Sequence, residues 1–152
     1  FSSKSSDGTS WTVIPDMGRT RGGISLMPYD KPADGAVLTY KFRLDNPATD
    51  DAELHVIVKS TLDYLNKGGL VYDVSIDGGK PQSVNFNARL NEHPDNIYSV
   101  YYPTVARRVG KGEHTVTFAP KDPAIVLEKL VIDLGGYRPG YLFGDESPHS
   151  RP

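Results

Sequence analysis

The stretch YDVSIDGGKPQSVNF, residues 72–86, predicts two short β-strands joined by a turn. Every second residue is apolar in the first half (Tyr, Val, Ile) and again at the end (Val, Phe). Alternation with a period of two places these side chains on one face of a strand. Asp77-Gly78 lies between the two runs, and an Asp-Gly pair in this position is typical of a β-hairpin.

Short runs with the same alternation recur along the chain, separated by turns that contain Gly or Pro. The clearest run is VLTYKFRL (37–44), whose Leu, Tyr and Phe residues share one face. IVLEKLVIDL (125–134) also has some helical propensity, but its alternation favours a strand. The other runs are WTVI (11–14), ISLM (24–27), ELHVIVKS (53–60), IYSVYY (97–102) and HTVTF (114–118). Many short strands without a βαβ rhythm predict an all-β fold, an antiparallel, jelly-roll-like β-sandwich.

Length and composition are those of one globular domain. The chain has 152 residues, of which 38% are hydrophobic and 24% charged, an ordinary balance for a folded protein. We expect a flexible lead-in or linker over residues 1–10, the sandwich over 11–147 and a short tail over 148–152. A formal net charge of −2 provides no field that would attract nucleic acid or an anionic membrane. The absence of cysteine excludes disulfides and thiol catalysis.

No motif for catalysis or metal binding stands out. The chain lacks GxSxG, P-loop and GxGxxG patterns, and its acidic residues nominate no particular catalytic pair. DNPATDD (45–51) gathers three carboxylates and could bind Ca²⁺, but a solvated loop is the simpler interpretation. We therefore predict no catalytic residue, no metal ligand and no cofactor, with Ca²⁺ as a weak alternative. The histidines, which are far apart and which we interpret as structural, are His55, His93, His114 and His149.

Aromatic residues and arginines are the features that suggest ligand binding. Carbohydrate sites combine an aromatic face, which packs against the C–H surface of a sugar, with polar groups that orient its hydroxyls. An Arg fork would in addition bind the carboxylate of a uronic acid. The alternative is that the aromatic residues fill the core, and for Trp11 this is the favoured interpretation. The candidate ligand-binding residues are Trp11, Arg19, Arg21, Tyr64, Tyr98 and Tyr102.

Four stretches of the chain, in order, resemble the C-terminal domain of glycoside hydrolase family 115, the xylan α-1,2-glucuronidases. They are WTVIPDMGRTRGGISLMP (11–28), STLDYLNKGGLVYDVSIDGGKPQSVNFNA (60–88), GEHTVTFAPKDPAIVLEKLVIDLGG (112–136) and YLFGDES (141–147). The resemblance implies an accessory β-sandwich whose parent enzyme carries its acid and base in a separate (β/α)-barrel. A barrel of that kind needs about 250 residues, so no catalytic residue transfers to this chain.

Two functions follow from the resemblance. The first is a carbohydrate-binding module for glucuronoxylan or another plant cell-wall glycan that bears uronic acid. The second is a structural or dimerisation domain that packs on the catalytic barrel and has no affinity for sugar. In either case the catalytic domain of the parent enzyme is a partner, and we expect a secreted or periplasmic bacterial protein.

Overall fold

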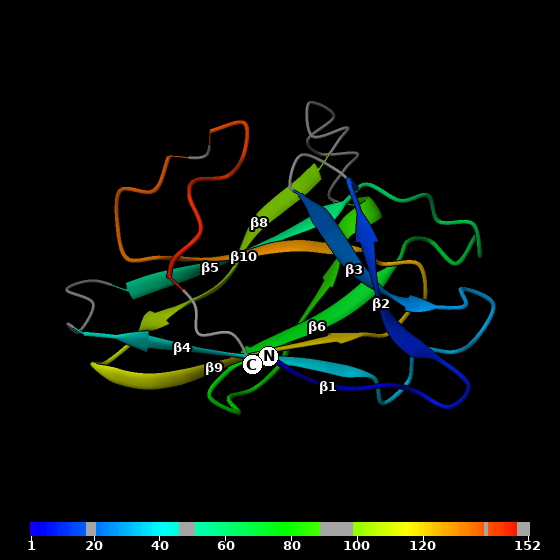
Figure 1. Ribbon diagram of the computed structural model, residues 1–152, viewed down its shortest axis with the longest axis horizontal. Coiled ribbons are helices and arrows are strands. Elements are labelled where there is room, and N and C mark those ends of the chain that lie inside the picture. Colours follow the sequence, from blue (N-terminus) through cyan, green and yellow to red (C-terminus); the bar gives the residue numbers. More distant parts are fainter. Residues whose placement is uncertain (18–20, 46–50, 89–98, 139, 149–152) are drawn as a thin grey trace.

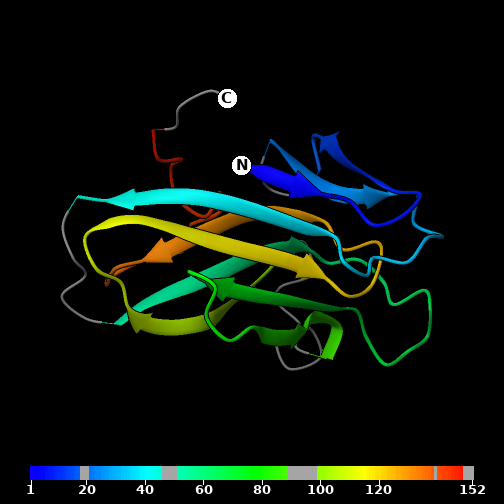
Figure 2. The same cartoon turned by 90° about the horizontal axis from the view of Figure 1, so that it is seen from below.

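The computed structural model describes residues 1–17, 21–45, 51–88, 99–138 and 140–148, with the strand at 99–108 described by its backbone. Within these ranges the chain forms two five-stranded sheets that pack as two layers (Figures 1 and 2). Neighbouring strands are antiparallel throughout the described pairs. The predicted antiparallel β-sandwich is therefore confirmed.

Each sheet combines strands from distant parts of the sequence. One sheet has the order β1-β4-β9-β6-β7, and the other has the order β2-β3-β10-β5-β8. The strands of the first sheet are β1 (Ser2–Lys4), β4 (Val37–Leu44), β9 (Gly112–Pro120), β6 (Val71–Ile76) and β7 (Gln82–Asn85). Those of the second sheet are β2 (Ser10–Pro15), β3 (Gly22–Met27), β10 (Leu127–Asp133), β5 (Asp51–Lys59) and β8 (Ser99–Arg108).

Each predicted run has its described residues largely on a strand, with differences in extent: residues 97–98 lie outside the described ranges, and Phe86 begins a helical turn. The run at 125–134 forms β10, so alternation prevailed over helical propensity. β8 extends to Arg108, beyond the predicted end at residue 102. Residues 2–4, which lie in the predicted lead-in, form β1 and pair with β4. Such a short polar edge strand carries no alternation of its own, and its partner decides its conformation.

The turn of the β6–β7 hairpin has the backbone that its sequence predicts. Asp77 and Gly78 have φ values of 48° and 65°, both in the left-handed region that Gly and Asp adopt most readily. The amide of Gly79 donates to the carbonyl of Ile76 at 2.9 Å, which closes the turn. The Asp77 carboxylate also accepts from the amide of Thr115 in β9 at 2.8 Å. The turn is thereby fastened to the neighbouring strand.

The hydrophobic core lies between the two sheets and contains the alternating residues of β6. Tyr72 and Val74 are buried, and the ring of Tyr72 lies 5.1 Å from that of Phe118 in β9. The opposite sheet contributes Leu54, Val56 and Val58 from β5, all fully buried. Burial of these side chains is the main stabilising term for a fold of this kind.

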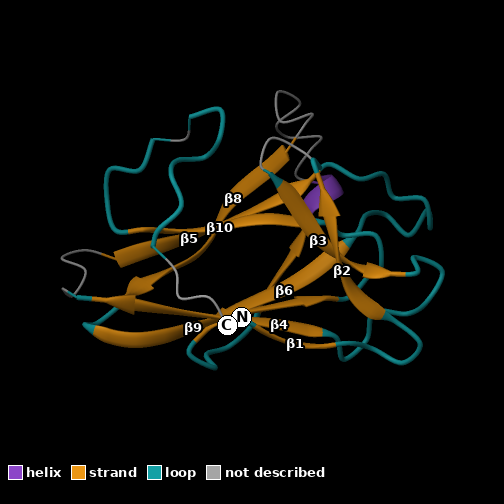
Figure 3. Ribbon diagram, in the orientation of Figure 1, coloured by secondary structure: helices purple, strands orange, loops and turns teal. Residues whose placement is uncertain are grey.

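Among the described residues, helical conformation occurs at residues 86–88 (Figure 3). None of the helices in the described part of the chain is long and apolar enough to cross a membrane.

Replacing Phe118 by alanine should lower the free energy of unfolding by about 3–5 kcal/mol, because its ring is fully buried and its loss leaves a cavity. Thr117→Ser, on the other face of the same strand, should change this energy by less than about 1 kcal/mol. Urea denaturation of the two variants measures the difference. Equal destabilisation would contradict the assignment of Phe118 to the core.

Candidate functional site

The loop at residues 60–70 connects β5 of one sheet to β6 of the other and presents apolar side chains to solvent. Tyr64 is 51% exposed and Leu62 is 85% exposed. An exposed aromatic ring of this kind can serve as a ligand platform if its backbone is held in place. The hydrogen bonds of the loop decide whether this condition is met.

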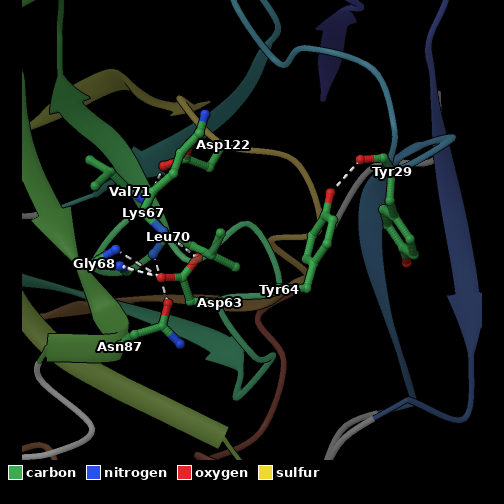
Figure 4. Close-up of polar contacts among 10 residues, drawn as sticks. Tyr29, Asp63, Tyr64, Lys67, Gly68, Leu70, Val71, Asn87 and Asp122 are labelled. Carbon is green, nitrogen blue, oxygen red and sulfur yellow. Dashed lines mark hydrogen bonds and ion pairs between the residues drawn. The ribbon is translucent and has the colours of Figure 1, made fainter.

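Asp63 organises the loop through its own backbone. Its Oδ2 accepts from the amides of Gly68 at 2.9 Å and Gly69 at 2.8 Å, and its Oδ1 accepts from the amide of Lys67 at 3.3 Å (Figure 4). Desolvation raises the pKa of the Asp63 carboxyl, but these amides outweigh it, so the pKa is lowered. The carboxylate is therefore ionised at neutral pH, and it closes the loop as a compact ring.

Two side chains from other segments anchor the end of the loop. Asn87 accepts from the amide of Leu70 at 2.7 Å and donates to the carbonyl of Thr61 at 2.8 Å, which ties the two ends of the loop together. Asp122 accepts from the amide of Val71 at 2.9 Å. The loop is thus fixed to residues that follow β7 and β9.

Tyr64 has a fixed hydroxyl and an accessible ring. Its hydroxyl donates to the carbonyl of Tyr29, which follows β3 (Figure 4). Desolvation by its surroundings, with the nearby carboxylates of Asp30 and Asp122, raises the pKa of Tyr64. Tyr64 therefore remains protonated at neutral pH and keeps this donor. Pinning the hydroxyl orients the ring, so that packing of a ligand on it would cost little conformational entropy.

The same loop carries a cationic group. The ammonium group of Lys67, whose side chain is 62% exposed, is 3.8 Å from Oδ1 of Asp122. At this separation the ion pair is weak, and the exposed ammonium stays available to other anions. An aromatic face and an ammonium group on one loop offer contacts to the apolar face and the anionic group of a ligand, respectively. We name Tyr64, Tyr29 and Lys67 the Tyr64 platform.

Trp11 has a structural environment. It pairs with Leu26 across β2 and β3, is partly buried, and packs against both hydrophobic clusters of the described residues. Its indole nitrogen donates to the carbonyl of Lys4 at 2.9 Å. These contacts agree with the core interpretation that was favoured for Trp11. Whether it also touches a ligand stays a prediction.

The structure separates the predicted arginine from the Tyr64 platform. Arg21 precedes β3, whereas Tyr29 follows it, so roughly 17 Å of extended strand lies between them. Arg19 and Tyr98 lie outside the described residues, and Tyr102 is described by its backbone alone, opposite Val56 in the register of β5 and β8. The predicted roles of these residues stay predictions. Most of the predicted Ca²⁺ loop, at 46–50, also lies outside the described residues.

Sequence reasoning named Tyr64 but missed the residues around it. Asp63 followed by Lys67-Gly68-Gly69 is a local signal, because an Asp side chain often accepts from amides a few residues later. Tyr29 offered no such signal, since its contact with Tyr64 arises from tertiary structure. A second group that sequence spacing missed is Glu53, His55 and Asp133, whose ligand atoms lie within 4.8 Å of one another.

Comparison with known protein families identifies one that matches nearly the whole chain. The family model of the glycosyl hydrolase family 115 C-terminal domain matches residues 1–146. A comparison with curated proteins finds no match.

Among solved structures, the chain is similar to part of a family GH115 4-O-methyl-α-glucuronidase with specificity for decorated arabinogalactans. The TM-score is 0.57 and the identity 19%, over 81% of this chain and 16% of that chain. It is also similar to a family 35 carbohydrate binding module from Clostridium thermocellum, with a TM-score of 0.55 and 9% identity, over 86% of this chain and 91% of that chain. At these identities the likeness shows the fold. The chain spans a small part of the glucuronidase and nearly all of the module.

Gly69→Ala should destabilise the loop strongly. Gly69 has φ of 122°, and a Cβ there would lie 2.0 Å from Oδ1 of Asn85. Asn85 can move only by giving up its bonds to the carbonyl of Gly68 and the amide of Ala88. We expect the free energy of unfolding, measured by chemical denaturation, to fall by about 2–4 kcal/mol. Gly68→Ala is the matched control: its φ is 88° but its Cβ would meet nothing within 4 Å, so about 1 kcal/mol should be lost.

Asp63→Asn should remove a pH-dependent part of the stability. The folded pKa of Asp63 is lowered, so its contribution is complete above the unfolded pKa of about 3.9 and is lost as pH falls through the folded value. We expect the melting temperature of the variant to fall below that of the original chain at pH 7 and to approach it near pH 2. A difference that is independent of pH would contradict the role of the carboxylate.

Proposed function

The chain belongs to the C-terminal domain family of glycosyl hydrolase family 115, as its motifs predict, and on this premise we propose that it is a non-catalytic carbohydrate-binding module. The observation that carries the proposal is the exposed ring of Tyr64, whose hydroxyl is held by a hydrogen bond to the carbonyl of Tyr29. The similarity of the fold to a family 35 carbohydrate binding module supports it. In this proposal the domain holds the polysaccharide while the catalytic domain of a parent α-glucuronidase removes its glucuronic acid substituents.

The ligand that we propose is a plant cell-wall glycan that bears uronic acid. The ring of Tyr64 would pack on the C–H face of one sugar, and the ammonium of Lys67 would bind the carboxylate of a neighbouring uronic acid. Glucuronoxylan is the first candidate, from the resemblance of the sequence motifs. Decorated arabinogalactan is the second, because the similar glucuronidase has specificity for it. Either glycan is met outside the cytoplasm, which suits a secreted or periplasmic bacterial enzyme.

A structural role is the second candidate function, and exposed apolar residues favour it. Tyr141 and Leu142 are adjacent and are 72% and 59% exposed, and Leu134 is 41% exposed. Apolar side chains gathered in one segment are typical of a contact surface between domains. In this alternative, Leu134, Tyr141 and Leu142 pack on the catalytic domain, and the chain has no affinity for sugar.

Tyr64→Ala should weaken binding of an acidic xylo-oligosaccharide by about tenfold, because the stacking surface is removed. Isothermal titration calorimetry with glucuronic-acid-substituted and unsubstituted xylo-oligosaccharides, and with arabinogalactan oligosaccharides, measures the effect. Lys67→Met should weaken binding of the acidic oligosaccharide alone.

Tyr141→Ala is the matched control, since it removes an exposed tyrosine from a different surface and should leave the affinity unchanged. Tyr64→Phe separates the two roles of this residue, because it keeps the ring and removes the hydroxyl that fixes it. If none of the three glycans gives a measurable heat of binding, the binding proposal is wrong for these ligands and the structural role is favoured.

A further inference from the structure

Three potential metal ligands meet on the outer face of the second sheet. Glu53 and His55 are alternate residues of β5, so they point to the same side, opposite to the core residue Leu54. Asp133, at the end of β10, lies directly opposite Glu53 in the register of the two strands. We name Glu53, His55 and Asp133 the β5–β10 cluster.

The distances between the imidazole and the carboxylates of the β5–β10 cluster fit ligands around a metal ion better than direct hydrogen bonds. Nε2 of His55 lies 3.5 Å from Oε2 of Glu53 and 3.5 Å from Oδ2 of Asp133. Charge-assisted hydrogen bonds are shorter, about 2.7–2.9 Å. Ligands of a tetrahedral Zn²⁺, at about 2.0–2.2 Å from the ion, are separated by roughly 3.3–3.6 Å. Both nitrogen–oxygen separations are therefore those of neighbouring ligands around a cation, and all three ligand atoms lie within 4.8 Å of one another.

Residues just after β10 hold the side chains of Asp133 and His55 in position. Oδ1 of Asp133 accepts from the amides of Gly135 at 2.7 Å and Tyr137 at 3.3 Å, which turns Oδ2 towards His55. The ring of Tyr137 lies 5.1 Å from the ring of His55 and helps to bury it. The side chain of His55 is 7% exposed and that of Asp133 is 16% exposed. Such supporting contacts are a regular property of protein metal sites, because they fix the ligand geometry.

Charge and ligand type narrow the class of ion. Two carboxylates placed directly opposite each other on neighbouring strands repel, and a divalent cation between them relieves the repulsion. An imidazole nitrogen suits Zn²⁺ and related transition metals, whereas Ca²⁺ and Mg²⁺ take oxygen ligands. The side chain of Glu53 is 45% exposed, so solvent reaches the open side of the cluster.

We propose that Glu53, His55 and Asp133 bind one Zn²⁺, with solvent in the fourth position. The ion joins β5 to β10 at the point where the chain leaves the sheet. The segment beyond β10 returns over the same face, where Lys129 donates to the carbonyls of Leu142 at 3.3 Å and Gly144 at 2.6 Å (Figure 1). Zn²⁺ at this position therefore stabilises the attachment of residues 134–138 and 140–144 to the sandwich.

The test is calorimetric titration of Zn²⁺ into the chelator-treated, untagged 152-residue chain at pH 7. We expect one saturable site, and a rise of about 5 °C or more in melting temperature at a hundredfold excess over Kd. His55→Gln should abolish the site, and Glu53→Gln should weaken it at least tenfold. His114→Gln is the matched control, because His114 also lies beside a carboxylate, 2.9 Å from Oδ2 of Asp77, and should leave Zn²⁺ affinity unchanged.

Circular dichroism tests whether each variant is folded. If His55→Gln does not fold, Glu53→Gln decides the outcome, because Glu53 is half exposed and its replacement should leave the fold intact. Absence of saturable Zn²⁺ binding would overturn the proposal and leave the cluster as a buried histidine between two carboxylates. Equal affinity in Glu53→Gln and the original chain would also overturn it. Preference for Ca²⁺ over Zn²⁺ in the same titration would contradict the assigned class of ion.

Discussion

The packing of the β6–β7 hairpin against the opposite sheet is the constraint on which the other features depend. Tyr72 and Val74 fill the core from one side, so a shift of one residue in register would turn them to solvent and bring Asp73 inside. Asp77 in the turn fastens the hairpin to β9 through the amide of Thr115. The hairpin thereby forms one edge of its sheet and is held in register with β9.

The Tyr64 platform is a consequence of that position. Asn87 lies just beyond β7, and the amide and carbonyl that it binds belong to the loop that precedes β6. Both ends of the hairpin therefore hold neighbouring segments, and the loop keeps its shape without help from a ligand. A preformed platform suits sugar recognition, because weak contacts to a glycan cannot meet the cost of ordering a flexible loop as well.

The two regions of chemical interest use different parts of the sandwich. The Tyr64 platform is carried by the connection between the sheets, whereas the β5–β10 cluster lies on the outer face of one sheet. His55 and Glu53 gave a local signal, since two potential ligands at alternate positions of a strand share a face. The signal was incomplete because Asp133 is distant in sequence, and sheet order alone brings β10 beside β5. The family, by contrast, was evident from sequence motifs.

The sequence by itself determined the all-β fold, the places of most strands and the backbone of the Asp77-Gly78 turn. These depend on local physics: alternation of apolar residues, and the few residues that tolerate positive φ. Only the tertiary structure decided which aromatic residues are displayed, because Trp11 and Tyr64 look alike in sequence but differ in burial. It also decided that β1 forms and that Arg21 lies away from Tyr64. Strand order and burial arise from contacts between distant segments, and no local pattern encodes them.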